Sequence, residues 1–113
     1  MDTTRQNKVS RLLQKEIANW FLLNPAKFHG AMISVSEVRI TPDLAEARIF
    51  VSVFPQDRRA EVFQEIGDAT KEIRFEVGKQ IRHQLRIIPE FIFKIDESLD
   101  YAERIEKLLN KTE

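Results

Sequence analysis

The sequence predicts an α+β domain, spanning residues 1–113, in which helices cover one face of a three-stranded sheet. Three observations favour this fold class. Apolar residues recur at helical spacing in four segments, they follow strand patterns in three others, and the segments follow the order α-β-β-α-α-β with a last α. Such an order places the helices in one layer and the strands in another. A chain of 113 residues is long enough to bury a hydrophobic core.

The first helix is predicted over residues 4–23 and carries two stripes. The apolar stripe consists of Val9, Leu12, Leu13, Ile17 and Trp20. The basic stripe, in which cations recur at i+3 or i+4, consists of Arg5, Lys8, Arg11 and Lys15. Asn24-Pro25 ends the helix, because a residue before proline disfavours the helical conformation. We expect residues 24–31 to form a loop.

Two strands are predicted over residues 32–40 and 44–54, joined by a tight turn at Thr41-Pro42-Asp43. The apolar residues of the first strand change parity halfway along it. A β-bulge near Ser36-Glu37 would return them to one face. The two strands should therefore form an antiparallel hairpin with one apolar face.

Two further helices and a third strand follow. Asp57 is the expected N-cap of a short helix over residues 58–66, which Gly67-Asp68 interrupts. A basic helix then runs from Lys71 to about residue 87, before Pro89. The inward residues of the third strand are Phe91, Phe93 and Ile95, and those of a last helix, capped by Ser98, are Leu99, Ala102, Ile105 and Leu109.

The basic helix is the most informative segment, because its cations share one solvent face. These cations are Lys71, Arg74, Arg82 and Arg86, with Lys79 at the edge of the face. Phe75 and Gly78 lie among them. An aromatic ring amid cations can stack on a base or on a guanidinium. The alternative is a charged face that is simply solvated, with Phe75 packed on a neighbouring loop.

The formal net charge is zero, but charge is segregated along the chain. Residues 1–30 hold five cations and two anions, and residues 69–94 hold six and three, so each block carries +3. Residues 31–68 hold four cations and seven anions, and residues 95–113 hold three and six, so each carries −3. Net charge is therefore a poor guide to the local field. Two basic blocks would form one surface if the fold brought the first helix beside the later one.

Composition argues against an enzyme. Cysteine is absent, which excludes disulfides and zinc–thiolate sites and suits a reducing cytoplasm. His29 and His83 are the only histidines and are too isolated for a histidine-based metal site. The three glycines form no phosphate-binding loop, and no nucleophile motif occurs. No apolar run is long enough to span a membrane, and the first ten residues lack a signal-peptide core.

Several segments, taken in order, resemble a known family. They are Arg5-Gln6-Asn7-Lys8-Val9; residues 33–40 followed by 43–52; Ile73-Arg74, Val77-Gly78, Ile81-Arg82, Pro89-Glu90 and Phe93; and residues 96–101 with Arg104-Ile105. Their order and spacing resemble the ribosome-binding factor A family over about residues 5–108. The resemblance implies a type II KH-like fold, an RNA-binding module of the order α-β-β-α-α-β.

One departure from the family pattern concerns the junction between the two consecutive helices. The family carries an Ala-x-Gly kink there, in place of the G-x-x-G loop of ordinary KH domains. Here the corresponding residues are Ala69-Thr70-Lys71, so that lysine stands in place of glycine. We therefore expect the kink to be shifted to Gly67 or replaced by a straighter junction. Residues 83–88 are also about two longer than the family spacing, which would lengthen the basic helix or its exit loop.

The resemblance implies a maturation factor of the small (30S) ribosomal subunit that binds 16S rRNA and supports rRNA processing and growth in the cold. It implies a cytoplasmic protein, and in the family a ribosome-associated GTPase removes the factor. We expect a monomer without cofactor or metal. The expected RNA-binding residues are Arg5, Lys8, Arg11, Lys15, Lys71, Arg74, Phe75, Lys79, Arg82 and Arg86.

Two other functions stay open. The first is a KH-like protein that binds single-stranded RNA outside the ribosome, against which the missing G-x-x-G loop counts. The second is a protein–protein interaction domain without RNA contact. It would use the acidic face of residues 96–106 or the exposed edge of the hairpin.

Overall fold

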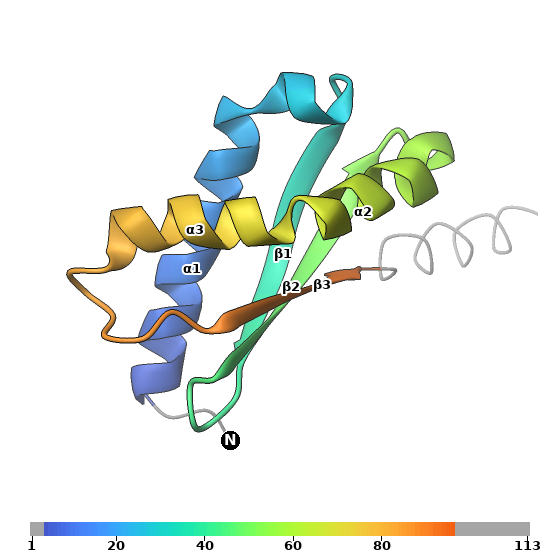
Figure 1. The fold of residues 1–113 in the computed structure, drawn as a ribbon. Coiled ribbons are helices and arrows are strands. Elements are labelled where there is room, and N and C mark those ends of the chain that lie inside the picture. The colour runs from blue at the N-terminus through green and yellow to red at the C-terminus, as the bar shows by residue number, and fades with distance from the viewer. Residues whose placement is uncertain (1–3, 97–113) are drawn as a thin grey trace, which may run out of the picture.

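The computed structural model describes residues 4–96, and its elements follow the order α-β-β-α-α-β (Figure 1). The elements are α1 (Thr4–Leu23), η1 (Pro25–Phe28), β1 (Met32–Ile40), β2 (Glu46–Phe54), η2 (Gln56–Arg58), α2 (Arg59–Asp68), α3 (Thr70–Ile81) and β3 (Glu90–Ile95), where η denotes a 3₁₀ helix. The predicted fold class is confirmed. The predicted last helix, capped by Ser98, lies outside the described residues.

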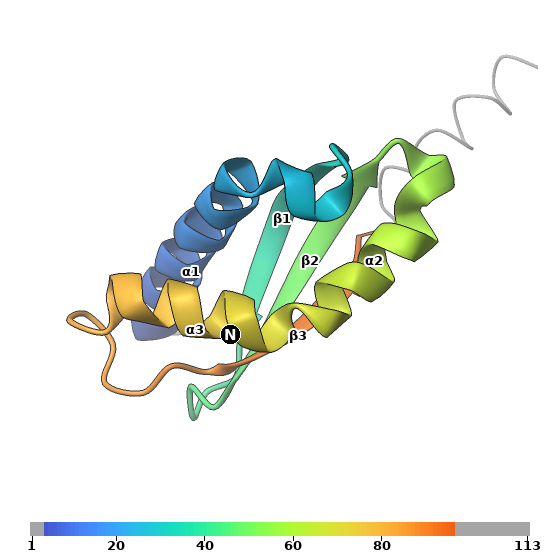
Figure 2. The same cartoon turned by 45° about the horizontal axis from the view of Figure 1, so that its top comes forward.

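The sheet has the strand order β1-β2-β3 and is mixed. β1 and β2 form the predicted antiparallel hairpin, and β3 returns parallel to β2 after the two helices. The three long helices lie over the same face of the sheet (Figure 2). α1 packs mainly on β1, and α3 crosses both α1 and β3.

The core lies between the sheet and the helices. Leu13 and Ile17 of α1, Ile49 of β2, and Ile73 and Ile81 of α3 have no exposed surface. Burying one such side chain contributes about 1.5–3 kcal/mol before the loss of chain entropy is subtracted. α3 therefore belongs to the core through one stripe and leaves its other sides for contacts.

The predicted bulge in β1 is present. The register of β1 against β2 shifts between Val35 and Glu37, which leaves Ser36 unpaired in the ladder. The Ser36 hydroxyl has two acceptors within reach, the Asp96 carboxylate at 2.6 Å and the Phe50 carbonyl at 3.2 Å. The bulge thus keeps the apolar residues on both sides of it against the helices.

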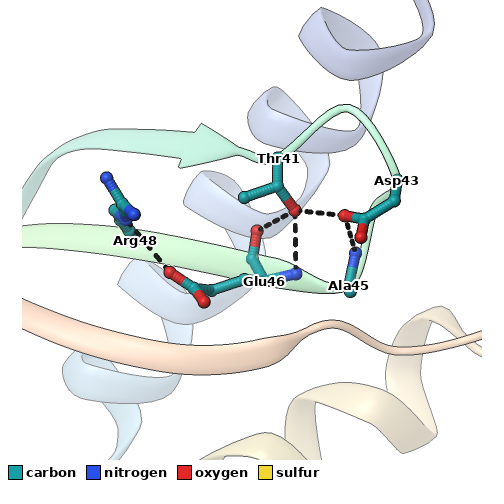
Figure 3. Close-up of polar contacts among 5 residues, drawn as sticks. All are labelled: Thr41, Asp43, Ala45, Glu46 and Arg48. Carbon is teal, nitrogen blue, oxygen red and sulfur yellow. Dashed lines mark hydrogen bonds and ion pairs between the residues drawn. The ribbon is translucent and has the colours of Figure 1, made fainter.

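The hairpin turn is held by side chains rather than by glycine (Figure 3). The Thr41 hydroxyl donates to Asp43 Oδ1 at 2.7 Å and accepts the Glu46 N–H at 3.1 Å. Asp43 Oδ1 also accepts the Ala45 N–H at 3.1 Å. Leu44 takes a left-handed conformation with φ of 60°. Because the turn uses residues up to Ala45, β2 begins at Glu46 and not at residue 44 as predicted.

Three predicted helix boundaries are wrong. α2 is not interrupted at Gly67-Asp68 but continues to Asp68. Asp57 is not an N-cap, because it lies inside η2, and Arg58 precedes α2 without a capping side-chain hydrogen bond. α3 ends at Ile81 rather than near residue 87. The N–H groups of Gln84 and Leu85 both donate to the Ile81 carbonyl, which closes a turn at this point. Residues 82–89 are therefore a connection that runs back to β3.

Among residues 4–96, none of the helices is both long and apolar enough to cross a membrane.

Candidate nucleic-acid interface

The junction between α2 and α3 is broken at Ala69, without a glycine. Ala69 has φ of −91° and ψ of 1°, outside the helical well, and its N–H donates to the Glu65 and Ile66 carbonyls. The Thr70 hydroxyl is a second donor to the Ile66 carbonyl, at 3.0 Å, near the end of α2. Gly67 lies inside α2, and Lys71 lies inside α3 as an exposed helical residue. The helix break is thus at Ala69, neither shifted to Gly67 nor absent.

The side of α3 that faces α1 carries its carboxylates. Glu76 accepts a hydrogen bond from the Trp20 indole N–H at 2.8 Å, and Glu72 forms an ion pair with Lys27. The Lys27 ammonium also lies 5.5 Å from the centre of the Trp20 ring. These contacts tie the negative charges of α3 to α1 and η1, which leaves its cations on the other sides.

The cations of α3 surround an open hollow of about 620 Å³, which we call the α3 hollow. It is lined by Lys71, Arg74, Phe75, Gly78, Lys79, Arg82 and Ile88. All of the candidate RNA-binding residues predicted between positions 71 and 82 are therefore brought together at one place. Of the lining residues in the described part of the chain, four are cations and none is an anion.

Arg74 differs from the other cations because its guanidinium is already used. Its Nε donates to the Pro89 carbonyl at 2.9 Å and one terminal nitrogen donates to the Ile88 carbonyl at 2.6 Å. Arg74 therefore holds the connection before β3 against α3. The Arg74 side chain therefore mainly stabilises the α3 hollow and is less available than the other cations to bind a phosphate.

Phe75 is the aromatic wall of the α3 hollow. Phe75 is 64% exposed, so much of the residue is open to solvent. The Lys79 ammonium lies 4.6 Å from the centre of its ring, one helical turn away. Gly78 is buried opposite Ile88, and a Cβ on Gly78 would lie 3.4 Å from Ile88 Cγ1. The glycine therefore serves close packing of a side chain, not of a backbone.

A second hollow, of about 530 Å³, lies where α1 begins, and we call it the α1 hollow. Its lining consists of Thr4, Arg5, Lys8, Val9, Leu12, Gln84, Leu85 and Arg86. It brings the first half of the basic stripe of α1 beside Arg86, which lies beyond the end of α3. Arg11 and Lys15 are exposed on α1 but line neither hollow.

The connection 82–88 contributes to both hollows, since Arg82 and Ile88 line one and Gln84 to Arg86 line the other. The sequence interpretation missed Ile88, Gln84 and Thr4. The pairing of a glycine with a bulky residue ten positions later was the only signal for Ile88. The other two residues depend on how the chain turns after Ile81.

His29 is less isolated than its sequence position indicates. Its ring nitrogen lies 3.1 Å from Glu65 Oε1, and the possible ligand atoms of His29, Glu61 and Glu65 all lie within 4.8 Å of one another. These are the residues in the described part of the chain that could hold a cation. The contact between His29 and Glu65 is explained by a hydrogen bond between an exposed imidazole and a half-buried carboxylate, and none of the three residues lines either hollow.

The fold and this cationic face define a class of protein, a small type II KH-like α+β domain. The description of the family whose profile matches residues 5–109 is ribosome-binding factor A. A protein of that name from Cytophaga hutchinsonii is 41% identical over 112 residues, which cover 98% of this chain and 84% of the relative. The chain therefore belongs to the ribosome-binding factor A family.

Solved structures support the fold. The crystal structure of ribosome-binding factor A from Thermus thermophilus matches with a TM-score of 0.66 at 14% identity, over 80% of this chain and 94% of that one. A homology model of the Thermus thermophilus protein, fitted into the cryo-EM map of a 30S–RbfA complex, matches with a TM-score of 0.59 at 18% identity. That match covers 86% of this chain and 97% of the other.

Proposed function

We propose that this chain is a non-enzymatic maturation factor that binds the 30S ribosomal subunit through 16S rRNA. We further propose that it acts in the cytoplasm as a single domain, during late subunit assembly, and that it supports rRNA processing and growth in the cold. The observation that carries the proposal is the pair of cationic hollows to which the connection 82–88 contributes. The fitting of a family member into a 30S complex supports the choice of partner.

The proposed mechanism rests on phosphate contacts. Lys and Arg side chains displace condensed counterions from phosphates, which gives affinity without sequence selection. Lys71, Lys79 and Arg82 at the α3 hollow, and Arg5, Lys8 and Arg86 at the α1 hollow, supply such cations. Two separate cationic hollows then favour a folded rRNA site, because A-form grooves are recognised mainly by shape.

Sedimentation with ribosomal particles tests the proposal. We expect the protein to sediment with 30S subunits but not with 70S ribosomes. Arg82→Glu combined with Arg86→Glu should abolish sedimentation while leaving the thermal midpoint nearly unchanged, because both side chains are exposed. A large fall in the midpoint would show instead that these arginines are structural.

A matched control uses cations on the other face of the sheet. Arg39 and Lys94 are exposed, and they alternate with core residues on their strands. Arg39→Glu with Lys94→Glu changes the net charge by the same amount and should leave 30S binding intact. Equal losses in the two double variants would indicate a general charge effect and not a defined interface.

The other two functions are distinguished by simple ligands. A single-stranded RNA-binding protein would shift short oligonucleotides as well as it binds 30S particles. A protein–protein interaction domain would keep its binding after RNase treatment of the subunit. We also propose a monomeric factor that is removed by a ribosome-associated GTPase, which release from 30S by added GTPase and GTP would test.

A further inference from the structure

We propose that the α3 hollow is a binding site for one unpaired RNA base, which stacks on Phe75 while the surrounding cations hold its phosphates. This inference rests on the proposed rRNA binding and adds a ligand class to it. Phosphate contacts alone would make the surface insensitive to whether bases are present. A stacking site would make it prefer bases that are free of pairing.

The exposure of Phe75 supports a stacking site. Nearly two thirds of this large apolar side chain is exposed on a helix whose other large apolar residues, Ile73, Val77 and Ile81, are buried. The Lys79 ammonium lies over the ring, as a cation does over an aromatic face. Lys79 is a flexible side chain that can move to a phosphate, which leaves the ring face for a base.

The volume and the walls of the α3 hollow also suit a base. Its volume of about 620 Å³ falls within the range of about 300–1,000 Å³ common for small-molecule sites. Gly78 lies one helical turn after Phe75, and because it has no side chain, Ile88 packs closely against α3 beside the hollow. Ile88 provides a second apolar wall, and Arg74 fixes that wall through the Ile88 and Pro89 carbonyls. The hollow is thus preorganised and partly apolar.

The charge around the α3 hollow suits an anionic ligand. Lys71, Lys79 and Arg82 line the hollow without an acidic neighbour among its described lining residues. The nearby carboxylates of Glu72 and Glu76 are held by Lys27 and Trp20. An apolar peptide segment would gain nothing from these cations. A nucleotide matches both parts of the site, because its base is flat and apolar on its faces and its phosphate is anionic.

Two RNA-like ligands of equal charge test the base site. We would measure, by fluorescence anisotropy, the affinity for a labelled octamer of adenosine and for an abasic ribose-phosphate octamer. The unmodified protein should bind the adenosine octamer about 5- to 150-fold more tightly, which is the range for one stacked base. Phe75→Leu should reduce this ratio to about one, and Phe75→Trp should keep it. Lys71→Gln with Lys79→Gln should weaken both ligands alike.

Three results would overturn the base site. They are equal binding of the two octamers by the unmodified protein, binding of neither, and an unchanged ratio in Phe75→Leu. None of these results decides the proposed rRNA binding, which the sedimentation of the unmodified protein with 30S subunits tests separately. If Phe75→Leu leaves the ratio unchanged but loses binding to RNase-treated subunits, the hollow is a protein-docking site. Unchanged thermal midpoints of the Phe75 variants serve as the folding control.

Discussion

Gln6 is a buried polar residue whose side chain joins α1 to the end of β1. It is 4% exposed, and its Nε2 donates to the Ile40 carbonyl at 2.9 Å. A buried carbonyl that loses its donor has no water to replace it, whereas an exposed one does. This contact therefore fixes the register between the N-terminal half of α1 and the sheet, and with it the position of Arg5 and Lys8.

Replacement of Gln6 should be costly. We expect Gln6→Leu to lower the free energy of unfolding by about 1–3 kcal/mol, because the Ile40 carbonyl is left unsatisfied. Gln14→Leu is the matched control, since Gln14 donates to the Val35 carbonyl at 3.2 Å from a half-buried position. Urea denaturation should show the smaller loss for Gln14→Leu. Equal losses would mean that burial of the Ile40 carbonyl is not the cause.

Asp43 makes the hairpin turn sensitive to acid. The hydrogen bond from the Thr41 hydroxyl, followed by that from the Ala45 N–H, lowers the pKa of the Asp43 carboxyl below its ordinary value of 3.8. Since the pKa is lower in the folded state, the charged form stabilises the fold above pH 3.8. That contribution is lost as the pH falls through the lowered pKa.

The acid sensitivity of the turn can be isolated with Asp43→Asn, which keeps an oxygen acceptor but cannot titrate. Thermal midpoints at pH 5 and pH 3 should differ less for this variant than for the unmodified protein. The two proteins should become more similar as the pH falls. A pH dependence that is identical in both would show that Asp43 does not contribute to it.

At the scale of elements, the α2–α3 junction shows why a lysine can stand where the sequence resemblance implies a glycine. Ala69, with φ of −91°, is the residue outside the helical well, and Lys71 is already helical. The break needs no left-handed residue, and the Thr70 hydroxyl is a second donor to the Ile66 carbonyl. A glycine at position 71 would therefore add chain flexibility without relieving strain.

We accordingly expect Lys71→Gly to destabilise the protein by about 0.5–1 kcal/mol relative to Lys71→Ala, the difference in helix propensity. Thermal or urea unfolding of the two variants measures this directly. Both variants lose the same cation, so their comparison removes the effect of charge. A more stable glycine variant would contradict the location of the break at Ala69.

The sequence predicts elements well where one local pattern determines them, and poorly where distant contacts do. The bounds of α1 and β1 are as predicted, because stripe periodicity, Pro25 and a change of parity are all local. The end of α3 was wrong by about six residues, because Leu85 and Arg86 fit the helical wheel. The turn at Ile81 depends instead on Arg74 reaching the carbonyls of a segment that is 14 or 15 residues away.

The residues of the candidate site were likewise predicted where one local pattern groups them, and missed where distant contacts do. A helical wheel was enough to group the cations of α3 with Phe75. It could not show that Arg74 is engaged, or that Arg5 and Lys8 meet Arg86. These relations arise because α3 crosses α1 and the chain then turns back beneath it (Figure 1).

At the scale of the whole molecule, a neutral chain presents a positive surface because its opposite charges lie on different elements or on different sides of α3. If the six cations assigned to the two hollows contact phosphates, the logarithm of the association constant for 30S subunits should fall with log salt at a slope of about −4.2 to −5.4. Arg82→Gln should make the slope shallower by about 0.7–0.9.

Arg74→Gln should hardly change the slope but should lower the thermal midpoint, because its guanidinium supports the fold. A slope near zero for the unmodified protein would contradict phosphate binding.

Trp20 is an intrinsic fluorescent probe that lies next to α3. It is the only tryptophan of the chain, and its indole N–H is hydrogen-bonded to Glu76, the neighbour of Phe75. Indole emission responds to the loss of such a bond and to the approach of the Lys27 charge. Occupation of the α3 hollow should therefore be visible as a change in intrinsic fluorescence, without any label on the protein or the RNA. The hydrogen bond between Trp20 and Glu76, which holds that carboxylate on the α1 side of α3, would thus also change the emission when the ligand binds.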